Sequence, residues 1–416
     1  KRAAQRLLAG LAEAALGGRD TIDVATDSDA RTHLLDSRSL SEPHRDKLGF
    51  RHDVLRDWAI GARLHENITL LDGVDLTVQP SPRLARGIEF AGRFALERAT
   101  NGAVWQALLE ALARPGAHAA WRRQALLAIV RSELSAELLN RCSDTLLAQG
   151  GALLIELCTA IIAVETMSAA ALFARIKAQG FEVPEGTTSL RAASSPSAPA
   201  MLMWCLDHQA QIPVHAIASV VKLVEIQFFL AMTISAYGQA AAGMLFDWLL
   251  QLDVRETAIA IPSPADAPRM QGEARSRMIE DLRSMTLLLA ANAPEKAKAY
   301  LRAVAGENDT YKVKAIRLFS KALASVAPAE LAALIEASLI ENPRKGRSRR
   351  ESMGRVFGFA DSDYMPASPA QTPFLDLLDA NQQIGLALIR TLVAAAVDGH
   401  AAGKATETNG FTVVVD

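Results

Sequence analysis

Residues 50–67, FRHDVLRDWAIGARLHEN, give the clearest helical signal in this chain. Their apolar side chains recur at the three- and four-residue spacing of one helix face, and their charged side chains fall on the other side. The apolar set is Val54, Leu55, Trp58, Ala59 and Ala62, and the charged set is Arg51, Asp53, Arg56, Asp57 and Arg63. The pattern predicts an amphipathic helix that buries Leu55, Trp58 and Ala62.

The first turn of this predicted helix contains His52 and Asp53. A helix N-terminus has unpaired N–H groups and a partial positive charge, so Asp53 is favourable there. The same groups can bind phosphate, and His52 would add a further donor. We therefore predict that His52 is accessible and that it is a candidate for reading a phosphate.

Residues 52–59, HDVLRDWA, resemble the methionine-histidine-aspartate motif of signal-transducing STAND ATPases. Arg51 stands where plant members of that family have methionine. In the family, the motif lies in a winged-helix module that follows a P-loop ATPase core, and its histidine reads the β-phosphate of bound ADP. The resemblance implies a nucleotide-sensing role for His52 and Asp53, with ADP or ATP bound by the parent protein. The alternative is an ordinary amphipathic helix with a surface histidine.

Composition indicates a large helical protein. A chain of 416 residues implies two or more domains or an elongated array. Half of the residues are hydrophobic but only 5% are aromatic, and the net charge of −2 gives no overall field that would recruit nucleic acid or an anionic membrane. Cys142, Cys158 and Cys205 are too few and too scattered for a disulfide framework or a metal site, which favours a reducing cytoplasm.

The expected fold class is all-α, an α-solenoid of HEAT- or TPR-like helical hairpins preceded by the end of a winged-helix-like module. In the first module we expect a helix at 3–16, a strand at 21–24, a helix at 30–37 and a polar turn at 41–49. In the array we expect short helices joined by brief turns, which form antiparallel hairpins. The expected helices are 83–98, 103–114, 117–130, 136–149, 152–164, 168–179, 201–209, 213–236, 239–252, 273–292, 294–305, 310–326 and 328–341.

The domain boundaries follow from breaks in this pattern. We expect the C-terminal part of a winged-helix-like module at 1–70, a helical array at 83–341, a basic and proline-rich linker at 342–373, a helical segment at 374–400 and the start of a truncated further domain at 404–416. Loop excursions are expected near 184–200 and 261–272, where serine, proline and alanine accumulate.

Residues 226–246 contain no charged side chain, which is compatible with a membrane span. Polar residues cluster inside the stretch, and Gly238 lies where a turn would divide two helices. We therefore expect internal helix broken near Gly238 and no membrane insertion.

Residues 341–355 form a dense basic run, and we expect an exposed linker there. A phosphate or nucleic-acid patch is the alternative, although no aromatic residue is interleaved. Residues 364–378 follow, with the pattern Y-x-P-x-S-P-x-x-x-P-F-x-x-L-L. This pattern resembles a segment in the helical region of some large bacterial ATP-binding proteins with STAND architecture.

The sequence contains no P-loop, no H-E-x-x-H, no C-x-x-C pair and no G-x-S-x-G motif. We expect no catalysis within these residues. Two hypotheses remain. The first is the sensor region of a STAND-type ATPase whose core precedes Lys1 and which binds a protein partner, such as a phage protein, with ligand-induced homo-oligomerisation. The second is a helical-repeat scaffold with no link to nucleotide.

Overall fold

The computed structural model describes residues 2–23, 29–44, 46–98, 102–178, 191–227, 235–254, 268–307, 312, 316–339 and 373–401. Eighteen α-helices and five short strands make up this part of the chain, which confirms the expected helical class. The chain divides into two compact units, Lys1–Ile226 and Gln227–Asp416. The basic run, the linker, most of the proline-rich segment and the expected further domain at 404–416 lie outside the described residues.

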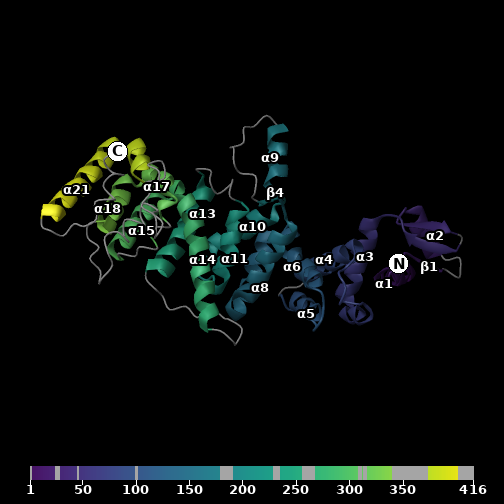
Figure 1. Ribbon diagram of the computed structural model, residues 1–416. Helices are drawn as coiled ribbons and strands as arrows, with labels where there is room; N and C mark the ends of the chain where they lie inside the picture. Colours follow the sequence, from purple (N-terminus) through teal and green to yellow (C-terminus); the bar gives the residue numbers. More distant parts are fainter. Residues whose placement is uncertain are drawn as a thin grey trace. The chain divides into compact units, whose positions relative to one another are not determined.

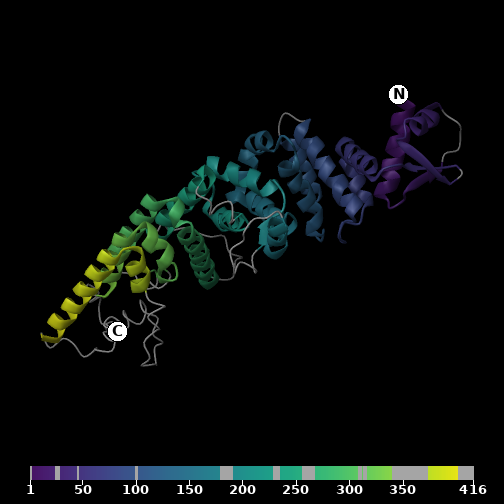
Figure 2. The same ribbon diagram turned by 90° about the horizontal axis from the view of Figure 1, so that it is seen from above.

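The first unit begins with a small module of helices and strands (Figure 2). Its core is one apolar cluster. Its strands form an antiparallel sheet in the order β1-β3-β2. The elements of the module are α1 (Arg2–Leu16), β1 (Thr21–Asp23), α2 (Asp29–Asp36), β2 (Leu40–His44) and β3 (Lys47–Phe50). The cluster is made by Leu11 of α1, Leu34 of α2, Leu40 of β2 and Leu48 of β3.

The predicted polar turn at 41–49 is wrong, because β2 and β3 form a hairpin there. Pro43 misled the prediction, since proline cannot donate to a ladder of strand hydrogen bonds. In the structure β2 is an edge strand, and the register shifts between Ser41 and His44, on either side of Pro43. A missing donor is tolerated at such an edge irregularity.

Helix α3 (Asp53–Glu66) lies beside α4 (Pro82–Glu97), as Figure 1 shows, but it packs through a different face from the one predicted. Trp58 remains 45% exposed and Leu55 37% exposed, so the prediction that they are buried is wrong. Ala62 is half-buried. The buried face carries Asp57, Ala59, Ile60, Gly61 and Leu64.

Two glycines explain why this face turns inward. A Cβ atom on Gly61 would lie 2.4 Å from the Cβ of Phe90, and a Cβ atom on Gly87 would lie 2.4 Å from Cγ2 of Ile60. The two helices therefore approach too closely for larger side chains at these positions. A periodicity that counts only large apolar residues cannot detect such a contact, because glycine contributes backbone and not side chain.

We expect Gly61→Ala to lower the free energy of unfolding of the first unit by about 1–3 kcal/mol, because the added methyl group meets Phe90 and the backbone of Ala91. Urea unfolding followed by circular dichroism measures the change. Gly10→Ala in α1 is the matched control, since nothing lies within 4 Å of its Cβ position. The control should be neutral or stabilising by about 0.5–1 kcal/mol. Equal effects of the two substitutions would contradict the close crossing.

The rest of the first unit is a chain of helices in which α4 packs on α6, α6 on α8 and α8 on α11. Besides α3 and α4, this part of the unit contains η1 (Ile68–Gly73), α5 (Ala103–Ala111), α6 (Ala119–Arg131), α7 (Ser135–Arg141), α8 (Ser143–Val164), β4 (Thr166–Ser168), α9 (Ala169–Ala178), β5 (Arg191–Ala193), α10 (Ser197–Asp207) and α11 (Val214–Glu225). The predicted helix at 136–149 is divided at Cys142.

The described part of the expected excursion at 184–200 is ordered structure. Strand β5 pairs antiparallel with β4, and Arg191 Nε donates to Thr166 Oγ1 at 2.8 Å across the pair. Helix α10 then begins at Ser197. The pairing is between residues 25 positions apart, which no local composition can reveal.

Arg131, the last residue of α6, pairs with carboxylates from two other elements of this array. Its guanidinium lies 2.6 Å from Oε2 of Glu89 in α4, and its Nε donates to Oε1 of Glu165 at 2.6 Å, at the end of α8. Burial alone would lower the pKa of Arg131, but the two carboxylates outweigh burial and raise it. The arginine is therefore charged and holds α4, α6 and α8 together.

Among the described residues, α8 is the helix long and apolar enough to cross a membrane, and one third of its most apolar window is buried. The backbone of α8 leaves helical geometry at four consecutive positions, 148–151, as the predicted turn at Gly150 and Gly151 requires. Two shorter helical pieces therefore replace one straight span.

The second unit is also helical. Its elements are α13 (Ala236–Leu249), η2 (Leu250–Val254), α14 (Pro268–Leu288), η3 (Ala290–Asn292), α15 (Pro294–Glu307), α17 (Ser320–Val326), α18 (Pro328–Leu339), α20 (Pro373–Ala380) and α21 (Gln382–Ala401). Helices α15, α18 and α21 pack in succession. The predicted starts at Pro294 and Pro328 are confirmed, as expected for proline in a first helical turn.

Four boundaries in the second unit differ from prediction. Helix α13 begins at Ala236, three residues before the expected start at 239, and its N-cap Ser235 accepts the N–H of Gly238, so the predicted boundary near Gly238 lies at Ser235. Helix α14 begins at Pro268, within the loop expected at 261–272. Within the expected helix at 310–326, Lys312, Ile316 and Arg317 are helical, but a turn at 318–319 precedes α17, which begins at Ser320. Residues 373–401 form two helices because Asn381 Oδ1 accepts the N–H of Ile384 and begins a second helix.

Candidate functional site

The predicted phosphate-reading residues lie at the exposed start of α3. His52 is the N-cap residue, with an extended backbone (φ −127°, ψ 138°) and no hydrogen bond from its side chain to the helix. Its carbonyl oxygen accepts the N–H groups of Leu55 and Arg56, at 3.1 and 3.3 Å. The imidazole is therefore exposed and is not used in capping the helix.

Asp53 is the first residue of α3, and its side chain is 84% exposed. Its carboxylate lies 2.9 Å from the guanidinium of Arg56, which also lies 3.0 Å from Asp57. Arg56 is thus held between an exposed carboxylate and a buried one. This arrangement stabilises the first turn of α3 without using the side chain of His52.

Asp57 is the charged residue of this motif that is buried, although the sequence placed it on the charged side of the helix. It is 2% exposed, accepts both Nε and Nη2 of Arg56, and lies 3.9 Å from Arg86 in α4. A buried carboxylate needs such partners, because an unpaired charge away from water is costly. Asp57 therefore connects the motif to α4. Because it is buried, it is not part of the exposed surface around His52.

An apolar groove of about 950 Å³ runs between α1 and α3. Its floor is formed by Leu8, Phe50, Leu55, Trp58 and Ala62. Trp58 is fixed edge-on against Phe94, with ring centroids 5.5 Å apart, so the exposed indole has a defined orientation. The residues predicted to face the core of the chain are thus the lining of an open surface groove.

The edges of this groove are basic. Arg2, Arg6 and Arg98 are exposed, and Arg98 also stacks on Phe94 with its guanidinium 4.5 Å from the ring centre. Arg63 also lines the groove but is paired with Glu13 and Glu66, and the hydrogen bond to Glu13 is the largest cause of its raised pKa. An aromatic floor with an arginine rim is the composition found at protein interfaces.

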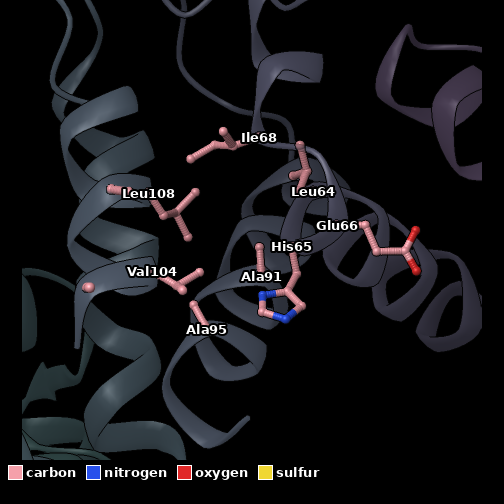
Figure 3. A pocket seen from close by; sticks show the side chains of 10 residues that line it. Leu64, His65, Glu66, Ile68, Ala91, Ala95, Val104 and Leu108 are labelled. Carbon is pink, nitrogen blue, oxygen red and sulfur yellow. The ribbon is translucent and has the colours of Figure 1, made fainter. Parts of the chain in front are cut away.

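A second hollow of about 350 Å³ lies between α3, η1, α4 and α5 (Figure 3). Its walls are aliphatic, and Val104 and Leu108 face Ala91 and Ala95 across it. His65 lies at its edge, and Nδ1 of this ring is buried without a hydrogen-bond partner in the described structure. Burial, followed by the charge of Arg98, lowers the pKa of His65, so the ring is neutral at pH 7.

Ser143 and His208 form a pair that resembles part of a hydrolase site, with 3.3 Å between Oγ and Nε2. The other ring nitrogen lies 3.0 Å from the carbonyl oxygen of Trp204, and the Trp204 indole donates to Ser143 Oγ at 3.2 Å. The serine thus receives one hydrogen bond and also lies 3.1 Å from the Leu139 carbonyl. These hydrogen bonds connect α8 with α10. The Ser143–His208 pair is therefore explained by the packing of the two helices.

The cysteines do not form a reactive centre. Cys142, Cys158 and Cys205 are free and buried. Burial raises the pKa of Cys158 to about 12 and raises that of Cys205 as well, so both thiols are protonated at neutral pH. Within the described ranges, no group of three His, Cys, Asp or Glu side chains could hold a metal ion.

No protein-family model matches this chain, and none of the curated proteins matches it significantly.

Proposed function

We propose that this chain is the regulatory and sensing region of a STAND-type ATPase, acting in the cytoplasm as a signal-transducing switch. The observation that carries the proposal is the exposed histidine at the start of α3, directly after a three-stranded sheet in the order β1-β3-β2. A short antiparallel sheet followed by the helix of the HDVLRDWA motif supports the winged-helix-like module that the resemblance implies. The bound nucleotide would be ADP in the off state, and His52 would donate to its β-phosphate beside the helix N-terminus.

The helices downstream support a sensing role. Each helix of the sequence α3, α4, α6, α8 and α11 packs mainly on the next, as do α15, α18 and α21 in the second unit. Serial packing of this kind is characteristic of HEAT- and TPR-like solenoids, whose extended surfaces bind proteins. Recognition of a foreign protein by the array, followed by release of ADP and assembly into a homo-oligomer, would make the parent protein a defence receptor.

His52→Ala in the full-length parent protein is expected to weaken ADP retention about tenfold or more, because a hydrogen bond to a charged group contributes roughly 1.5–3 kcal/mol. Basal activity without partner should rise for the same reason. The measurement is the nucleotide content of the purified protein and its ADP dissociation constant. Asp53→Ala should loosen the same state more weakly, through loss of the pair with Arg56 at the helix start.

His44→Ala is the matched control, since this histidine is equally exposed but lies in β2. It should leave ADP affinity unchanged. If His52→Ala also leaves the ADP affinity unchanged, the proposal that His52 senses nucleotide is wrong. The chain would then be a helical-repeat scaffold for protein partners, which is the second candidate function and is favoured by the groove around Trp58.

A further inference from the structure

We propose that the groove between α1 and α3 binds an amphipathic helix from a partner protein, with leucine-like side chains on one face and acidic side chains at its edges. The proposal is independent of nucleotide sensing by His52, because it rests on the groove lining alone. Its first support is shape. A volume of about 950 Å³ between two helices accommodates several aliphatic side chains, and a helix presents such side chains at every third or fourth residue.

The second support is a preorganised aromatic anchor. Trp58 is 45% exposed, although its ring is fixed edge-on against Phe94, and Arg98 covers the same phenyl ring. An exposed tryptophan that is already ordered loses little entropy on binding, and tryptophan dominates the energetics of many interfaces. The other four tryptophans, Trp105, Trp121, Trp204 and Trp248, are at most 5% exposed.

The third support is charge. Arg2, Arg6 and Arg98 are exposed at the edges of the groove, and the carboxylates of Glu13 and Glu66 are engaged with Arg63. The rim therefore carries an excess of positive charge around an apolar floor. Electrostatic complementarity selects an acidic partner and disfavours a basic one. Nucleic acid is a poorer match, because half of the residues that line the groove are apolar and phosphate groups gain nothing from contact with them.

Binding of a defined peptide tests the proposal. The probe is a fluorescein-labelled, capped helical peptide of about 18 residues with leucines at helical spacing on one face and glutamates elsewhere. The whole chain should bind it with a dissociation constant below about 100 µM at low salt, as measured by fluorescence anisotropy, and more weakly as salt is raised. A peptide with lysine in place of every glutamate should bind at least about tenfold more weakly.

Acrylamide quenching of tryptophan fluorescence locates the peptide. Because Trp58 is the exposed tryptophan among the five, all of which are described, quenching of the native chain reports the groove. An unlabelled acidic peptide should reduce this quenching at the concentrations that saturate anisotropy. Unchanged quenching with bound peptide would overturn the proposal, because the peptide would then be bound elsewhere.

Matched variants complete the test. Leu55→Asp and the double variant Arg6→Glu/Arg98→Glu should each weaken peptide binding about tenfold or more. Val54→Asp is the control, since Val54 is 56% exposed on the same helix but does not line the groove. It should change affinity less than about twofold. Equal loss in Val54→Asp and Leu55→Asp, no binding by the acidic peptide, or tighter binding of a short DNA duplex or of phosphatidylserine vesicles would each overturn the proposal.

Discussion

Asp253→Ala is expected to lower the free energy of unfolding of the second unit by about 3–5 kcal/mol, because it leaves buried cations without their counter-charge. Asp253 lies in the π-helical turn η2 and is 5% exposed. Its carboxylate accepts Nη2 and Nε of Arg283 at 2.8 and 3.1 Å and the hydroxyl of Tyr300 at 2.6 Å. Lys312 donates to the backbone carbonyl of the same aspartate.

The network joins η2, α14 and α15. Burial works against the charge on Arg283, but the hydrogen bond to Asp253 and the neighbouring groups outweigh it and raise the pKa of the arginine. Burial, together with the charge of Asp253, raises the pKa of Tyr300, so its hydroxyl keeps the proton that it donates. Loss of the carboxylate therefore leaves a charged guanidinium buried at 9% exposure.

Hydrogen exchange in α13, α14 and α15 of the whole chain would measure this loss separately from the first unit. Asp247→Ala is the matched control, since Asp247 forms a 2.7 Å ion pair with Lys296 while its side chain is 48% exposed. Exposed pairs contribute about 0–1 kcal/mol, so the control should change protection little. Similar losses in the two variants would show that the buried network contributes no more than a surface pair.

Trp105→Ala is expected to destabilise the first unit by about 3–5 kcal/mol, because it removes a large, fully buried side chain. The indole of Trp105 packs between α5 and α6 and donates Nε1–H to the carbonyl oxygen of Ala125 at 2.8 Å. Its removal leaves a cavity and an acceptor without a donor.

Trp58→Ala provides the comparison within the same unit. Because Trp58 is 45% exposed and its ring contact is with Phe94, its removal should cost less than about 1.5 kcal/mol. Urea unfolding followed by far-ultraviolet circular dichroism measures both variants. If Trp58→Ala lowers the free energy of unfolding more than Trp105→Ala does, Trp58 is buried as the periodicity predicted. That result would contradict the exposed position of Trp58 on α3.

Local sequence determined where many of the helices begin and end. Ser81 accepts the N–H of Leu84 and Pro82 opens α4, while Gly18 adopts φ +81° directly after α1. Prolines open α15 and α18 in the same way. These signals act within one turn of the backbone, so the chain displays them without its tertiary partners. The position of His52 at the start of α3 was predictable for the same reason.

Tertiary structure alone decided which face of each helix is buried and which residues meet. Helix α3 turns Gly61 inward because Phe90 and Ala91 approach it closely, and this leaves Trp58 in a groove. Strand β2 pairs with β3 on both sides of Pro43, and it tolerates the proline because it is an edge strand of the assembled sheet.

The same is true of the buried charges. Asp253, Arg283 and Tyr300 are separated by up to 47 positions, and each alone resembles an ordinary surface residue in the sequence. A local pattern reports backbone preference and amphipathicity, whereas helix crossing distances and long-range ion pairs depend on how separate segments pack. The sequence therefore determined the helices and the motif at His52, and packing determined the groove and the network that stabilises the second unit.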